Sequence, residues 1–210
     1  MKKVALVTLG CSRNETDSEE LAARLANDGW ELVTNADDAD VALINTCGFV
    51  EAAKKDSIDA VLEANSLKHG KANSLKKVVA VGCMAERYGK ELEAALPEAD
   101  GILGFDHYAD ISDRLTKILA GENIQAHAPS DRRKLLPIAP AERKQPIRST
   151  KMGEGERVLR KRLDNAPVAP LKIAAGCDRR CTFCAIPFFR GAFVSRTQDE
   201  IISEAKWLAD

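Results

Sequence analysis

The sequence lacks any apolar run that could cross a membrane, since a span needs about 18 or more consecutive apolar residues. The apolar stretch near the start, residues 4–9, is interrupted by Thr8. It is also shorter than the ~7–15 residues that the apolar part of a secretory signal occupies. We therefore expect a cytoplasmic protein in a reducing environment, where cysteines tend to be metal ligands or catalysts rather than disulfide partners.

Histidine is scarce as well, with three residues in a chain of 210, and His69, His107 and His127 all stand apart from the cysteine motifs. A nucleophilic cysteine activated by histidine therefore has little support. The six cysteines are too few for a disulfide scaffold, and three lie early in the chain while three lie late. This distribution favours two separate metal sites.

The near-neutral net charge of −1 hides two regions of opposite sign. Residues 1–120 contain fourteen Lys/Arg against twenty-one Asp/Glu, whereas residues 132–162 contain eleven Lys/Arg against three Glu. With 45% hydrophobic residues, the chain has enough apolar material for one large or two modest domains.

The first 120 residues alternate short β-type apolar runs with longer stretches of helical periodicity. Thr16 and Glu19 resemble a capping box at the start of the first helix. This alternation predicts an α/β domain, an open parallel sheet flanked by helices. We expect strands at 4–10, 31–33, 41–47, 78–83 and 101–104, and helices at 15–27, 50–67, 85–95 and 108–119.

Beyond residue 120 the pattern changes. Six prolines punctuate the basic stretch 121–170, which predicts a linker. An apolar strand is expected at 171–175 and a helix at 198–208. We therefore expect three parts, a domain at 1–120, the linker at 121–170, and a second domain that starts at 171. One βα unit is too small to fold alone, so we expect this second domain to be cut off at residue 210.

Cys11, Cys47 and Cys83 are separated by 36 residues each time, and each follows a predicted strand. Residues that follow parallel strands gather at one edge of the sheet, where open α/β sheets bind ligands. Each cysteine also precedes a predicted helix, whose N-terminus favours a thiolate, and has a glycine beside it that leaves room for a bulky group. The pattern favours an iron–sulfur cluster over the alternative of three buried core cysteines.

The late cysteines form a C-x3-C-x2-C motif of Cys177, Cys181 and Cys184. Three thiolates in one loop can hold three corners of a cubane cluster and leave the fourth iron without a protein ligand. The alternative is zinc with a remote fourth ligand, because structural zinc sites normally have four ligands.

Four motifs carry a family resemblance. GCDRRCTFC, with Phe183 before the last cysteine, resembles the radical S-adenosylmethionine signature. TLGCSRNETDSE, NTCGFVEAAKKDSID and VGCMAERY narrow the resemblance to the methylthiotransferases, over residues 1–105 and 171–210. The resemblance implies an N-terminal methylthiotransferase domain followed by the first βα unit of a truncated radical-SAM partial β/α barrel, so that this fragment would be inactive alone.

The resemblance also implies the cofactors. Cys11, Cys47 and Cys83 would bind an auxiliary 4Fe-4S cluster, and Cys177, Cys181 and Cys184 would bind the radical 4Fe-4S cluster, whose open iron binds S-adenosylmethionine. Within the family, NTCGF and CAIPFFRGAFVSR look like the enzymes that add a methylthio group to the β-carbon of an aspartate in ribosomal protein S12. The alternative is the branch that modifies tRNA adenosine. An electron donor such as a flavodoxin would be a partner.

Other roles remain open at this point. The chain could be an iron–sulfur electron carrier or a cluster-binding module. Arg190 and Arg196 could contact the cofactor carboxylate or the target, or be ordinary structural arginines. The basic linker could contact ribosomal RNA or be a solvated hinge.

Overall fold

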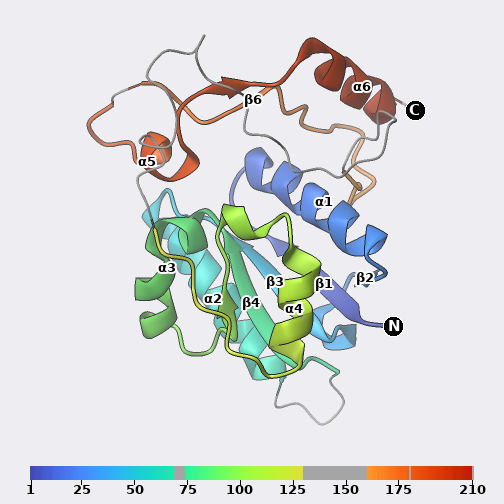
Figure 1. Ribbon diagram of the computed structural model, residues 1–210, viewed down its shortest axis with the longest axis vertical. Helices are drawn as coiled ribbons and strands as arrows, with labels where there is room; N and C mark the ends of the chain where they lie inside the picture. The colour runs from blue at the N-terminus through green and yellow to red at the C-terminus, as the bar shows by residue number, and fades with distance from the viewer. Residues whose placement is uncertain (69–73, 130–159, 180, 210) are drawn as a thin grey trace. The chain divides into compact units, whose positions relative to one another are not determined.

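The computed structural model describes residues 1–68, 74–129, 160–179 and 181–209 (Figure 1). The described chain divides into two compact units, residues 1–129 with 160–163 and residues 164–179 with 181–209. We describe each unit by itself. Across the described ranges, no helix is both long and apolar enough to cross a membrane.

The first unit contains a parallel five-stranded sheet with the order β2-β1-β3-β4-β5. The predicted α/β class, with its open parallel sheet, is therefore confirmed. β5 is much shorter than the predicted stretch 101–104. The strands are β1 (Lys3–Thr8), β2 (Glu31–Val33), β3 (Val41–Thr46), β4 (Lys77–Gly82) and β5 (Gly101–Ile102).

Helices cover both faces of this sheet, with α1 and α4 on one face and α2 and α3 on the other (Figure 1). Right-handed crossovers explain this division, because the chain moves from β1 outward to β2 in one direction and from β3 through β4 to β5 in the opposite direction. The helices are α1 (Ser12–Asn27), α2 (Glu51–Leu67), α3 (Cys83–Ala95) and α4 (Ile111–Leu119), with 3-10 turns η1 (Ala36–Asp38) and η2 (Phe105–His107).

β3 is the central strand and is buried along its whole length. Its alternate side chains enter two separate cores, as the period of two in a strand requires. Val41 and Leu43 pack in the core under α1 and α4, whereas Ala42 and Ile44 pack in the core under α2 and α3. This is why the run reads as continuously apolar in the sequence.

The predicted capping box at Thr16 and Glu19 is wrong. α1 begins at Ser12, with Cys11 in an extended conformation at its N-cap position. Thr16 lies inside the helix, where its hydroxyl donates a hydrogen bond to the Arg13 carbonyl (2.8 Å). The helix starts earlier than predicted because the chain turns into it directly after the end of β1.

Residues 160–163, within the predicted linker, belong to the first unit. Arg160 forms a hydrogen-bonded ion pair with Glu19 of α1, and Arg162 Nε lies 3.3 Å from the same carboxylate. The Lys161 N–H donates to the Glu19 carbonyl (3.0 Å). The rest of the basic segment, and most of the predicted linker 121–170, lies outside the described residues.

In the second unit, β6 (Ala174–Ala175) and β7 (Val194–Ser195) form an antiparallel pair. β6 covers part of the predicted strand 171–175. α5 (Ile186–Arg190) stands between these strands in sequence, and α6 (Gln198–Ala209) matches the predicted last helix. The three-part domain division and the partial β/α barrel stay predictions.

A half-buried ionic network ties the start of β4 to the segment before β5. The Asp100 carboxylate accepts a hydrogen bond from the Val78 N–H (2.8 Å) and forms ion pairs with Lys68 and with Lys77 (3.0 Å). Burial alone would raise the pKa of Asp100, but the hydrogen bonds from Lys68, Val78 and Lys77 outweigh it and lower this pKa below its ordinary value.

Asp100→Asn is expected to lower the free energy of unfolding at neutral pH by about 1–3 kcal/mol, because it weakens charge-assisted hydrogen bonds in a half-buried network. The lowered pKa stabilises the folded state above the ordinary carboxyl pKa, and this contribution is lost as the pH falls through the folded value. The difference between variant and parent in urea melts should therefore shrink below about pH 4. Asp59→Asn is the control. The ion pair of Asp59 with Lys55 is exposed, so this substitution should change the free energy of unfolding by less than about 0.5 kcal/mol.

Candidate metal centre

The three early cysteines follow three neighbouring strands of the sheet. Cys11 comes shortly after β1, Cys47 directly after β3, and Cys83 directly after β4, and these strands are parallel and adjacent. The structure thus brings them to one edge of the sheet, as the sequence predicted. Cys47 and Cys83 are 7% and 6% exposed, whereas Cys11 is exposed. In the described chain none of the six cysteines is in a disulfide.

This edge includes the topological switch point of the sheet. β1 and β3 are neighbours, but the connection after β1 leads to β2 on one side and the connection after β3 leads to β4 on the other. The helices that follow these strands lie on opposite faces of the sheet, and open α/β sheets bind ligands outside the carboxyl ends of the strands at such a point. Cys11 and Cys47 stand on the two sides of this point.

Glycines allow the three cysteine turns to approach one another closely. Gly10 has a φ of +95°, and a Cβ added there would lie 2.8 Å from Cys47 Cβ and 3.1 Å from its Sγ. A Cβ on Gly48 would lie 2.8 Å from the Cys83 carbonyl oxygen. The first turn therefore contacts the second, and the second contacts the third.

Two helix N-termini and one arginine lie beside the cysteine turns. Cys11 is the N-cap residue of α1, and Cys83 is the first residue of α3. The Cys47 N–H donates to the Ser57 hydroxyl (2.9 Å), and Arg87 donates to the Gly48 carbonyl (2.9 Å). Helix N-termini and a nearby guanidinium favour negative charge, so this edge can accommodate thiolates.

Asn14 also contributes to this site, and no pattern in the sequence points to it. Its side chain is fully buried and makes hydrogen bonds to Leu9, Thr46 and Cys83. An asparagine three residues after a cysteine looks like any polar residue at the start of a helix. Its partners lie up to 69 residues away, so no local pattern could identify it.

The donor set at this edge fits an iron–sulfur cluster. Three thiols lie on adjacent turns, two of them shielded from water, and the glycines keep side-chain bulk away. Thiolates are the ligands that such clusters take. That Cys11, Cys47 and Cys83 hold a cluster stays a prediction.

The late cysteines lie on the loop between β6 and α5. The Cys177 N–H donates to the Gly191 carbonyl (3.1 Å), and the Cys184 N–H donates to the Cys181 carbonyl (3.2 Å) in a tight turn. Cys177 and Cys184 are half-buried and Cys181 is exposed. Phe183 is 85% exposed. The loop is thus closed at its base by backbone bonds while its thiols remain accessible, which fits a cluster open to a further ligand.

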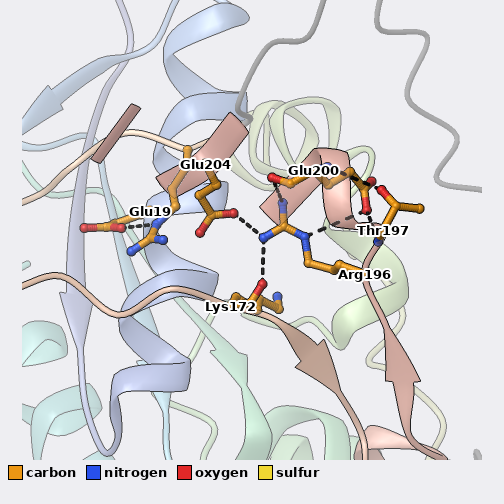
Figure 2. A network of polar contacts seen from close by, with 7 residues as sticks. Glu19, Lys172, Arg196, Thr197, Glu200 and Glu204 are labelled. Carbon is orange, nitrogen blue, oxygen red and sulfur yellow. Dashed lines mark hydrogen bonds and ion pairs between the residues drawn. The ribbon is translucent and has the colours of Figure 1, made fainter. Parts of the chain in front are cut away.

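Arg196 is engaged within the second unit (Figure 2). Its guanidinium donates to the Lys172 carbonyl (2.7 Å) and to the Glu200 carbonyl (3.3 Å), and it forms an ion pair with Glu204. These bonds join the segment before β6 to α6. They favour the structural role that the sequence left open for Arg196. Arg190 is the last residue of α5.

A second group of potential ligands was not predicted. Glu86, Asp106 and His127 have ligand atoms within 4.8 Å of one another. Glu86 already accepts a hydrogen bond from the Phe105 N–H (2.7 Å) and lies 3.2 Å from His127 Nε2. A Cβ on Gly104 would lie 2.4 Å from Glu86 Oε2. We interpret this group as the packing that joins α3 to the chain after β5.

Comparisons with known proteins give a family and several relatives. Residues 3–104 match a family described as uncharacterized protein family UPF0004. The whole chain is 61% identical to the ribosomal protein uS12 methylthiotransferase RimO of Streptomyces coelicolor and 62% identical to that of Kineococcus radiotolerans. The protein of the same name from Frankia casuarinae is 57% identical over 99% of the chain. The chain spans 45%, 44% and 42% of the lengths of these three relatives.

Proposed function

Since this chain belongs to the methylthiotransferases, with residues 3–104 in the family UPF0004, we propose that it is the N-terminal part of an enzyme that methylthiolates ribosomal protein S12. The target atom in this proposal is the β-carbon of an aspartate. The observation that carries it is the gathering of Cys11, Cys47 and Cys83 at one edge of the sheet, on a chain that also has a C-x3-C-x2-C loop.

Two 4Fe-4S clusters and S-adenosylmethionine would supply the one-electron and sulfur-transfer chemistry when bound. Cys177, Cys181 and Cys184 would ligate three irons and leave the fourth open to the amino and carboxylate groups of S-adenosylmethionine. Cys11, Cys47 and Cys83 would hold the second cluster at the sheet edge, and this cluster would supply the sulfur-transfer chemistry. The protein's part is to hold the two sites, orient the target and limit access of water.

The printed names of the relatives support the ribosomal-protein substrate over tRNA. The three-cysteine motif supports an enzyme over an electron carrier, because three thiolates leave one iron without a protein ligand and a carrier needs no open ligand position. With a ribosomal substrate, we propose a cytoplasmic location and a flavodoxin-type electron donor. Contact of the basic segment 132–162 with ribosomal RNA would be an additional, salt-sensitive interaction.

The experiment uses a protein of the relatives' full length that carries this sequence, reconstituted anaerobically with iron and sulfide. With reductant and S-adenosylmethionine, it is expected to add a methylthio group to the aspartate of an S12 peptide, read by mass spectrometry, and to leave tRNA unmodified. Modification of tRNA adenosine instead of the S12 peptide would overturn the proposal that S12 is the substrate. Clusters that transfer electrons but do not respond to S-adenosylmethionine would favour the electron carrier.

A further inference from the structure

We propose that Asn14 is the positioning residue of the sheet-edge cluster site, holding the turns of Cys11 and Cys47 in register with each other beside Cys83. This inference rests on the proposed function, because it assumes that these cysteines bind a cluster. Asn14 lies in the first turn of α1 and is 0% exposed. A fully buried carboxamide must have its hydrogen bonds satisfied within the protein.

The Asn14 amide nitrogen joins the first two turns. It donates to the Leu9 carbonyl (2.8 Å) and to the Thr46 carbonyl (3.1 Å). Leu9 stands two residues before Cys11, and Thr46 directly before Cys47. One NH₂ group therefore ties the chain after β1 to the end of β3, across the switch point.

The Asn14 oxygen contacts the third turn. The Cys83 thiol donates to Asn14 Oδ1, with 3.4 Å between sulfur and oxygen. Because both carbonyls at Leu9 and Thr46 require a donor, the nitrogen must face them and the oxygen must face Cys83. The carboxamide thus has a single orientation. The contact to Cys83 needs the protonated thiol, and a thiolate that ligates iron has no proton to donate. With iron bound, the two bonds of the amide nitrogen are therefore the ones that hold the turns.

The backbone of Asn14 is itself held by hydrogen bonds to Cys11 and Asn45. Its N–H donates to the Cys11 carbonyl (2.8 Å), and its carbonyl accepts from Asn45 Nδ2 (2.9 Å). Asn45 Nδ2 also donates to the Ser18 hydroxyl (2.8 Å), which accepts from Thr8 Oγ1 (2.7 Å). A connected polar network of this kind resists displacement of any one member.

Asparagine is the residue that this position requires. Leucine would fill a similar volume but leave the Leu9 and Thr46 carbonyls unpaired. Aspartate has the same shape but offers two acceptors where two donors are needed, and its charge would face both carbonyls. Partners that orient metal ligands in this way commonly change metal affinity about 10–100-fold when they are removed.

The test isolates the early site in the full chain by replacing Cys177, Cys181 and Cys184 with serine. This parent is loaded anaerobically with ferrous iron and sulfide, and Asn14→Asp and Asn14→Ser are compared with it. Asn27→Asp is the matched control, since Asn27 is an exposed asparagine at the other end of α1. We expect both Asn14 variants to release iron to a chelator at least about tenfold faster than the parent, and to change the EPR spectrum of the reduced cluster.

A merely structural role would lower the melting temperature but leave the EPR spectrum unchanged in the folded fraction. Unchanged spectra and iron release in both Asn14 variants would therefore overturn the proposal. If Asn14→Asp does not fold, Asn14→Ser decides, because serine keeps one hydroxyl donor and leaves space for water. A parent that binds no iron would overturn the proposed cluster site itself, and this result is distinguishable because it precedes any change at Asn14.

Discussion

Replacing Cys11, Cys47 and Cys83 together by serine is expected to remove about half of the iron that the chain binds, about four of about eight atoms. The rest should remain on Cys177, Cys181 and Cys184, because the two triplets lie in separate compact units and share no ligand in the proposal. Iron and sulfide analysis after anaerobic reconstitution measures the loss. Adding S-adenosylmethionine should still change the EPR spectrum of the remaining cluster.

The reciprocal variant is the matched comparison. Serine at Cys177, Cys181 and Cys184 should also leave about four irons, but the spectrum should then no longer respond to S-adenosylmethionine. Loss of all iron from either variant would mean that the six cysteines form one shared site. If the chain without substitutions binds about one zinc and no iron, the result would instead favour the alternative of a zinc site with a remote fourth ligand.

Gly82→Ala is expected to lower the free energy of unfolding by about 3 kcal/mol or more, because strain and overlap act together. Gly82 has φ +91° and ψ −159°, a region that side-chain-bearing residues rarely occupy. A Cβ there would lie 2.1 Å from Asn45 Oδ1 and 2.7 Å from the Thr46 carbonyl oxygen. Relief would require β3 and β4 to separate just before Cys47 and Cys83, so iron binding at the sheet edge should fall as well.

Gly29→Ala separates the two causes. Gly29 has a φ of +83°, but a Cβ there would meet nothing within 4 Å. Gly29→Ala should lower the free energy of unfolding by about 1–2 kcal/mol, from backbone strain alone, and iron binding should not change. If urea melts show the same decrease in the free energy of unfolding for both variants, the short distances from a Cβ at Gly82 to Asn45 and Thr46 have no energetic effect.

The secondary structure was largely predictable because its causes are local. The continuous apolar run of β3 and the helical spacing of Leu21 and Leu25 in α1 are visible in the sequence. The start of α1 was misplaced because its N-cap, Cys11, has a conformation that depends on the turn after β1. β6 is shorter than its apolar run suggests, and it pairs antiparallel with a segment twenty residues later.

By itself the sequence determined that this is an α/β protein with an open parallel sheet, that its cysteines fall into two triplets, and that the early triplet lies at one sheet edge. These conclusions follow from periodicity and from the common direction of parallel strands. The tertiary structure alone decided the order of the strands, the switch point between β1 and β3, and the contacts of Asn14 and Arg196. Such features depend on contacts between residues far apart in the chain, which no local pattern encodes.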